Sequence, residues 1–122
     1  MAKRDPKYID VPNICFSHIS KDDDRKPKYK KQRMQRGFDD SETWSLDVTF
    51  AEFMLPRLER FKEIVVQVNK PDTKFDRDVN DVIEALKLII RDNGTRFFSD
   101  AEEKQVQKGL KTLSRLFLSL WW

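Results

Sequence analysis

Apolar residues recur at helical spacing in three stretches of the chain that follow Gly37. Within each stretch the members lie three or four residues apart, which places them on one face of an α-helix. The three series are Phe50, Met54, Leu58, Phe61, Val65 and Val68; Phe75, Val79, Val82, Ile83, Leu86, Ile89 and Ile90; and Val106, Leu110, Leu113, Phe117, Leu120 and Trp121. The pattern predicts an all-α fold in which three helices, at about 38–68, 75–92 and 99–121, pack as a three-helix bundle.

Local signals mark where these helices begin and end. The stretch NKPDTKF, at 69–75, places an asparagine and a proline where the first helix should stop, and DNG, at 92–94, supplies a glycine for the left-handed conformation that closes the second. Ser99 and Glu102 have the spacing of a capping box, which predicts the start of the third helix. Gly109 lies inside the third helix, where glycine costs about 1 kcal/mol relative to alanine, so it indicates a close helix crossing.

Pro56 stands inside the first predicted helix, although proline lacks an amide donor and clashes with the carbonyl four residues earlier. The apolar series nevertheless runs through it from Phe50 to Val68. Either one helix bends there, or two shorter helices meet with Pro56 in the first turn of the second. We expect one helix, bent at Pro56.

Charge is distributed unevenly along the chain, whose net charge is +3. Residues 1–37 hold eleven basic and five acidic residues, whereas residues 38–122 hold thirteen basic and sixteen acidic residues. The first segment also contains prolines and lacks a sustained helical period. The sequence therefore predicts an irregular basic N-terminal arm at 1–37, followed by the helical bundle at 38–122.

Seven basic residues between Arg25 and Arg36, with no acid among them, form the strongest candidate for a binding site. Cations in such a run neutralise phosphates, and an interleaved tyrosine can stack on a base. The same run could instead dock on an acidic protein or stay solvated, and the sequence leaves all three alternatives open. The candidate partner- or phosphate-binding residues are Arg25, Lys26, Lys28, Tyr29, Lys30, Lys31, Arg33 and Arg36.

Four carboxylates crowd into nine residues at Asp39, Asp40, Glu42 and Asp47. Such a cluster could hold a hard cation or act as acid and base. However, the D-x-x-E spacing of Asp39 and Glu42 directly before an apolar helix is typical of a capping box. No second acidic or histidine cluster in the sequence supplies further ligands, so we expect capping here.

Capping does not account for Asp47, which lies a full turn further along, close to Trp44. Asp47 could be a buried partner of Arg57 or of the backbone near Ser45. Placement on the surface is slightly favoured over burial. Together, Trp44 and Asp47 form a candidate interaction surface.

Cys15 and His18, three residues apart, have the spacing of half a zinc site. The chain has one cysteine and one histidine, so these types cannot supply four ligands. A Cys–His nucleophile would lie in a segment without a predicted rigid scaffold. We therefore expect no metal, no cofactor and no catalytic residue, and a protein that is not an enzyme.

The composition also indicates in which cellular compartment the protein is expected. A single cysteine cannot form an internal disulfide, and no charged-then-apolar leader opens the chain. The longest apolar runs fall far short of the roughly 20 residues needed to cross a bilayer. We expect a cytoplasmic protein without a membrane partner.

The stretch LFLSLWW, at 116–122, combines the last members of the third apolar series with two adjacent tryptophans. Phe117 and Leu120 are expected to face the core. Bulky groups at Trp121 and Trp122 require either docking within the chain or a pocket on a partner. Docking over the end of the bundle is favoured, and both tryptophans are candidate interaction residues.

Two stretches, GFDDSETWSLDVTFAEFMLPRLERFKE at 37–63 and GLKTLSRLFLSLWW at 109–122, resemble the start and finish of a family of small uncharacterised proteins encoded by tailed bacteriophages and prophages. The shared pattern is a glycine and an aromatic residue, two or three acids, a tryptophan, Leu-Asp, an apolar helix ending in Pro-Arg-Leu, and a double tryptophan. The resemblance implies an origin in a phage genome. Small helical phage proteins commonly bind a host or phage protein, and some inhibit bacterial defence systems.

These observations lead to two functional hypotheses. The first is a small phage-encoded protein that binds and modulates or inhibits a host macromolecule, such as a component of bacterial defence. The alternative is a nucleic-acid-binding accessory protein that uses the basic arm. An enzyme ranks third.

Overall fold

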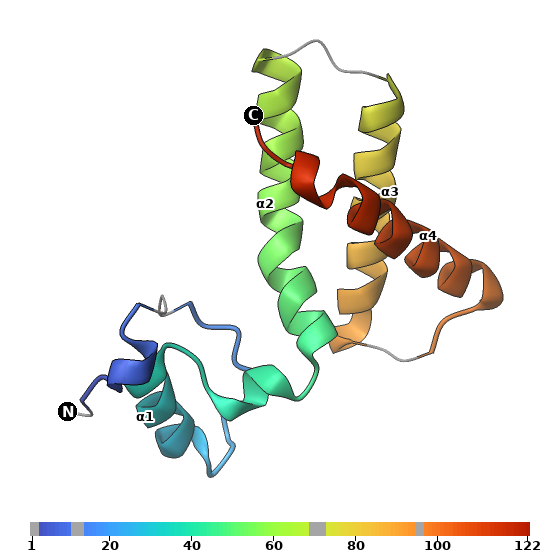
Figure 1. Cartoon of the computed structure of the whole chain (residues 1–122). Coiled ribbons are helices and arrows are strands. Elements are labelled where there is room, and N and C mark those ends of the chain that lie inside the picture. The colour runs from blue at the N-terminus through green and yellow to red at the C-terminus, as the bar shows by residue number, and fades with distance from the viewer. Residues whose placement is uncertain (1–2, 11–13, 69–72, 95–96) are drawn as a thin grey trace. The chain divides into compact units, whose positions relative to one another are not determined.

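The computed structural model describes residues 3–10, 14–68, 73–94 and 97–122. Over these residues the regular structure is entirely helical, which confirms the predicted all-α class. The four α-helices are α1 (Lys26–Arg36), α2 (Leu46–Val68), α3 (Thr73–Ile90) and α4 (Asp100–Leu116), and Figure 1 labels each of them. Short 3₁₀ turns lie at Pro6–Tyr8, Asp40–Thr43, Arg91–Asn93 and Phe117–Ser119.

Contacts divide the chain into two compact units, Met1–Thr49 and Phe50–Trp122. Residues 38–49, which the sequence analysis assigns to the helical body, thus belong by their contacts to the first unit. Each unit has its own internal packing and is described separately.

The first unit contains α1, which covers most of the basic run. The prediction of an irregular conformation is therefore wrong for residues 26–36. A proline in the first turn suits the helix start, and Gly37 ends the helix with a left-handed φ of 88°. Acidic side chains nearby pair with several of these cations, as described below, and this pairing accompanies the ordered helix.

The second unit contains most of α2 together with α3 and α4, so the three helices predicted from periodicity occur. Their ends differ from the prediction at two places. α2 begins at Leu46 rather than near residue 38, because Asp40–Thr43 forms a separate 3₁₀ turn. α4 stops at Leu116, and a 3₁₀ turn over Phe117–Ser119 follows it.

Several predicted boundary signals are confirmed. Ser99 and Glu102 form both hydrogen bonds of a capping box at the start of α4. Gly94 takes the left-handed conformation, with φ of 91°, after the end of α3. α2 continues without interruption through Pro56, so the alternative of two separate helices is not what the structure has. The bend itself stays a prediction.

The core of the second unit is made of side chains from all three helices. The buried residues are Ala51, Leu55 and Leu58 from α2; Val79, Val82, Ile83, Ala85, Leu86 and Ile89 from α3; and Val106, Gly109, Thr112, Leu113 and Leu116 from α4. The predicted series on α3 is largely confirmed. On α2 the predicted face is partly wrong, because Phe50 is 41 % exposed while Ala51 is fully buried.

α2 and α3 meet through side chains rather than through close backbones. The Phe61 and Phe75 rings pack edge to face with centroids 6.3 Å apart. Lys62 donates a hydrogen bond of 2.6 Å to the Asn80 side chain. Among the described helices, none has the length and apolar composition needed to span a membrane.

α4 crosses α3 closely, as Figure 1 shows, and Gly109 lies at the crossing. A Cβ atom at residue 109 would lie 2.7 Å from the Asp81 carbonyl oxygen and would overlap the Ala85 Cβ. Real Cβ atoms essentially never approach so closely, so only glycine fits here. The close crossing predicted from Gly109 is confirmed.

Replacement of Gly109 by alanine should therefore destabilise the protein. Alanine gains about 1 kcal/mol of helix propensity over glycine, but the overlap with the Asp81 carbonyl forces the two helices apart, at a cost of about 1–3 kcal/mol. Chemical denaturation followed by circular dichroism measures the net loss. Gln107→Ala, at an exposed position of the same helix, is the control and should change stability by less than about 0.5 kcal/mol. A Gly109→Ala protein more stable than the wild type by about 1 kcal/mol, the full gain in helix propensity, would contradict the close crossing.

Candidate functional site

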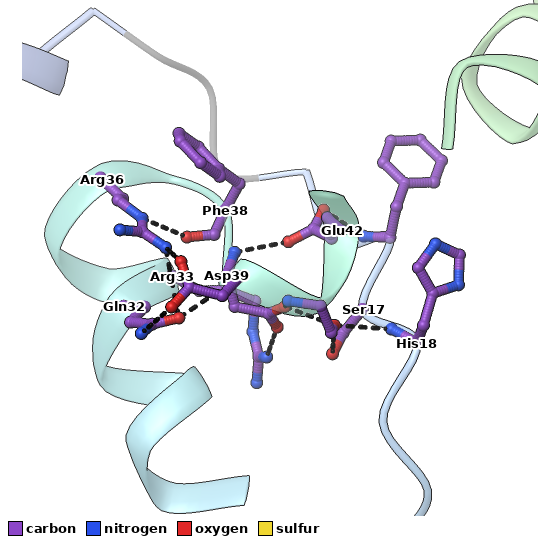
Figure 2. A network of polar contacts seen from close by, with 11 residues as sticks. Ser17, His18, Gln32, Arg33, Arg36, Phe38, Asp39 and Glu42 are labelled. Atoms are coloured by element: carbon purple, nitrogen blue, oxygen red, sulfur yellow. Dashed lines mark hydrogen bonds and ion pairs between the residues drawn. The ribbon is translucent and has the colours of Figure 1, made fainter. Parts of the chain in front are cut away.

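The basic run and the acidic cluster, treated as separate candidates in the sequence, come together in the first unit. We call residues 39–42 the acidic turn. It lies directly after α1, and the Gly37 amide hydrogen bonds back to the Arg33 carbonyl at 2.8 Å. This reversal brings the acidic turn alongside the last turns of α1 (Figure 2). This arrangement determines which charged side chains are paired within the first unit and which are not.

Asp39 is the centre of the acidic turn and is fully buried. Its carboxylate accepts hydrogen bonds from the Ser41 amide at 2.9 Å and from the Ser41 hydroxyl at 2.5 Å. Glu42 completes the capping box by accepting from the Asp39 amide at 2.7 Å. The predicted capping box of Asp39 and Glu42 is present, but it caps the 3₁₀ turn Asp40–Thr43 and not the apolar helix α2.

Two arginines of α1 pair with the acidic turn. Arg33 donates to the Asp39 carboxylate at 2.5 Å, and only 18 % of its side chain is exposed. Arg36 pairs with Asp40, and its guanidinium also donates to the Phe38 carbonyl at 3.1 Å. Figure 2 shows these guanidinium groups pointing from α1 towards the turn. Arginine suits such sites because its planar group makes several directed hydrogen bonds.

Gln32 strengthens the same junction. Its amide nitrogen donates to the Asp40 carboxylate at 2.9 Å, while its carbonyl oxygen accepts from the Asp40 amide at 2.8 Å. Both polar ends of the Gln32 side chain are therefore occupied within the chain.

A segment well before α1 joins the acidic turn from the other side (Figure 2). The Phe16 amide donates to Glu42 at 2.9 Å, and the His18 amide donates to the Ser41 hydroxyl oxygen at 2.9 Å. The hydroxyls of Ser17 and Ser41 lie 3.2 Å apart. The contacts of Ser17 and Ser41 were not predicted from the sequence, since no local spacing links residues more than 20 positions apart.

The pKa of Asp39 lies below its ordinary value. Burial opposes ionisation of this carboxyl, but the hydrogen bonds from Ser41, Ser17 and Arg33, together with the positive charge of Arg33, outweigh that effect. The Arg36 and Gln32 hydrogen bonds likewise lower the pKa of Asp40. Both groups are carboxylates at neutral pH.

The other members of the predicted basic site divide into two groups. Tyr29 is only 4 % exposed and meets Trp44 edge to face at a centroid distance of 6.0 Å, so its ring is not available for base stacking. The Arg25 guanidinium lies 5.0 Å from the Trp44 ring centroid and pairs with Asp23 at 2.8 Å. Arg25 is itself exposed, and so are four lysines, Lys26, Lys28, Lys30 and Lys31, which we call the lysine face.

The remaining candidates lie at the surface. Asp47 is exposed in the first turn of α2, in agreement with the favoured surface placement, and Trp44 is 49 % exposed. Cys15 is exposed, and the His18 ring hydrogen bonds to the Thr49 hydroxyl at 3.0 Å rather than facing Cys15 as a ligand pair. Over the described residues, no group of three or more Cys, His, Asp or Glu side chains could hold a metal ion.

The predicted docking of the two tryptophans over the bundle end is wrong. Trp121 is 75 % exposed and Trp122 is 63 % exposed. Phe117 and Leu118 are also exposed, at 56 % and 89 %. Phe117 follows Leu110 by seven residues, and Leu110 is itself 38 % exposed within α4, so this column of the predicted apolar face lies at the edge of the core. We call Phe117, Leu118, Trp121 and Trp122 the aromatic patch.

Comparison of the chain with protein-family models, with curated proteins and with solved structures gave no match.

Loss of the Asp39 carboxylate should cost much more than a helix cap. Asp39→Ala leaves the shielded Arg33 unpaired and removes both Ser41 hydrogen bonds, so we expect a loss of about 3–5 kcal/mol. Denaturant unfolding, together with amide exchange in α1, measures it. Asp40→Ala is the matched control, because Asp40 is half exposed and its ion pair should contribute no more than about 1 kcal/mol. Equal losses in the two variants would show that Asp39 acts only as a cap.

Acid should weaken the first unit through the same carboxylate. Because the pKa of Asp39 is depressed on folding, its contribution is present above the unfolded pKa, about 3.9, and is lost as the pH falls through the folded value. Amide exchange in α1 measured from about pH 5 downward should show this loss. Asp39→Asn should make the dependence shallower, leaving the part due to Asp23 and Asp40. An unchanged pH dependence in Asp39→Asn would contradict the assignment.

Proposed function

We propose that the chain is a small phage-encoded, non-enzymatic protein that binds a host macromolecule and modulates or inhibits it, with a component of bacterial defence as the candidate target. The phage origin rests on the resemblance of residues 37–63 and 109–122 to small proteins of tailed phages. The host cytoplasm is the proposed site of action. We further propose that α2, α3 and α4 form a three-helix bundle, with α2 bent at Pro56, that carries the binding surface.

The aromatic patch is the observation that supports this proposal. Four large apolar side chains within six residues are between about half and nine-tenths exposed. A surface tryptophan is costly to leave in water, and tryptophan is among the residue types that most often dominate protein–protein binding energy. Two adjacent exposed tryptophans therefore favour a protein partner with an apolar pocket.

The charge near the aromatic patch indicates which kind of partner surface fits it. The stretch from Lys104 to Trp122 contains four basic residues and no acidic residue. Lys104, Lys108, Lys111 and Arg115 are all exposed, although Lys108 and Arg115 each pair with an aspartate of α3. The partner surface that fits is an apolar pocket with an acidic rim, because opposite charge at the rim speeds association and fixes orientation.

A binding role is also favoured over an enzymatic one by the state of the polar groups in the first unit. Ser41 and Asp39 are hydrogen bonded to each other, but both are fully buried. The His18 ring, which would have to act as the base, bonds to Thr49 instead of Ser41. A substrate could not reach this serine without opening the unit.

Affinity capture from a bacterial lysate, followed by titration of the purified captured protein, tests the proposal. Trp121→Ala/Trp122→Ala should lose the captured protein, and its dissociation constant should rise by about 30-fold or more if one tryptophan is a hot spot. Ile9→Ala is the control, since Ile9 is 61 % exposed and belongs to the first unit, and it should bind like the wild type. Retention of the same partner with unchanged affinity by the double variant would overturn the proposal.

A further inference from the structure

We infer that the lysine face of α1 is a sequence-independent binding surface for the phosphate backbone of nucleic acid. This inference is independent of the proposed function, since it concerns the first unit and rests on different residues. Its starting point is the division of the basic run into arginines that form ion pairs with nearby acids and exposed lysines that form none among the described residues.

The four lysines are exposed, whereas Tyr29, which packs on Trp44, and the arginines that pack on the acidic turn are buried or half-buried. Tyr29, Arg33 and Arg36 follow one another at intervals of four and three residues, so they share one side of α1. That side is the one whose partners are Asp39 and Asp40, and Tyr29 on it is buried. Lys28 and Lys31, three residues apart, point away from that side, whereas Lys26 and Lys30 flank it, because Lys26 is three residues before Tyr29 and Lys30 is three residues before Arg33.

Arginines pair with three of the nearby acids, which leaves the exposed Asp22 and Asp24 as the other carboxylates just before α1. The Asp39 carboxylate is taken by Arg33 and Ser41, and the Asp40 carboxylate by Arg36 and Gln32. Asp23, just before the helix, is taken by Arg25, which lowers the pKa of Asp23 to about 2. Four ammonium groups thus remain exposed on less than two turns of a helix that is fixed at its C-terminal end.

The composition of the lysine face favours phosphates over the other anionic partners. Protein interfaces are depleted in lysine and depend on aromatic or arginine anchors, whereas Tyr29 is buried and Arg33 and Arg36 are paired. Stable binding of a helix to an anionic membrane surface combines cations with large apolar groups that insert beside them, and the exposed apolar residue among these lysines is Pro27. A phosphate backbone requires only mobile point charges, which lysine provides.

The same structure predicts that binding does not depend on base sequence. Bases are read by arginine, asparagine or glutamine side chains with free bidentate groups. On α1 the amide of Gln32 and the guanidinium groups of Arg33 and Arg36 are already occupied. Contacts made by lysine alone position a protein on nucleic acid without specifying sequence.

Fluorescence anisotropy with a labelled random DNA duplex, a random single strand and an RNA of equal length tests the inference on the full chain. If each of the four lysines neutralises one phosphate, affinity should fall about 100-fold between about 50 and 200 mM salt, and unrelated sequences should bind equally. Replacement of Lys26, Lys28, Lys30 and Lys31 by glutamine should weaken binding at least about tenfold at the lower salt concentration and flatten the salt dependence.

Two matched variants separate the lysine face from net charge. Replacement of Lys87, Lys104, Lys108 and Lys111 by glutamine removes the same charge from the second unit and should leave binding within about threefold of the wild type. Replacement of the four α1 lysines by arginine keeps the charge and should keep the binding. Amide exchange in α1 confirms that each variant is folded, and the arginine variant tests the inference even if the glutamine variant is not.

Defined results would overturn the inference. These are the absence of binding by the wild type at the lower salt concentration, an equal loss in the second-unit variant, loss of binding in the folded arginine variant, or equally tight binding to polyglutamate or to phosphatidylserine vesicles. Trp121→Ala/Trp122→Ala should bind nucleic acid like the wild type. If the aromatic patch does not bind a protein, the nucleic-acid binding of the lysine face is therefore unaffected. If the lysine face does not bind nucleic acid, the test of the aromatic patch is equally unaffected.

Discussion

The buried carboxylate of Asp39 is the constraint on which the first unit depends. A carboxylate without exposure to water must be fully hydrogen bonded and paired with a cation, because isolated burial of its charge is prohibitively costly. Ser41 and Arg33 meet that requirement at 2.5 Å each. Arg33 comes from α1 and Ser41 comes from the acidic turn, so one anion fixes the helix against the turn. The Ser41 hydroxyl oxygen in turn accepts from the His18 amide, which attaches the preceding segment to the same point.

The same constraint determines which cations can serve in binding. An arginine placed against a buried carboxylate cannot also hold a phosphate, and a buried tyrosine cannot stack on a base. Of eight residues with equal standing in the sequence, four exposed lysines form no ion pair among the described residues, Arg25 is exposed but pairs with Asp23, and the other three contribute to the structure around Asp39 and Trp44. A basic run is therefore not a single site. Pairing inside the chain divides it into a structural part and an exposed part.

Short-range signals in the sequence predicted much of the fold, and long-range pairing accounts for most of what was missed. Periodicity predicted α3, capping spacing predicted the capping boxes of Asp39 and Ser99, and the cost of a helical glycine predicted the crossing at Gly109, because each depends on neighbours within a turn or two. The helical state of Lys26–Arg36 depends on acids beyond the helix end, and the role of Ser41 depends on a segment more than 20 residues earlier. Neither leaves a local pattern. The misplacement of Phe50 has another cause, since hydrophobic size alone does not indicate which of two adjacent residues, Phe50 or Ala51, faces a close neighbour.

The two candidate surfaces differ in the physical force that each can use. The lysine face offers charge with almost no apolar area, so its binding energy comes from counterion release and falls steeply with salt. The aromatic patch offers apolar area bordered by cations that are partly paired with Asp78 and Asp81, so most of its energy comes from burial, which salt does not screen. Because salt acts on one surface and leaves the other largely unchanged, the ionic strength at which a partner is released identifies which of the two surfaces holds it.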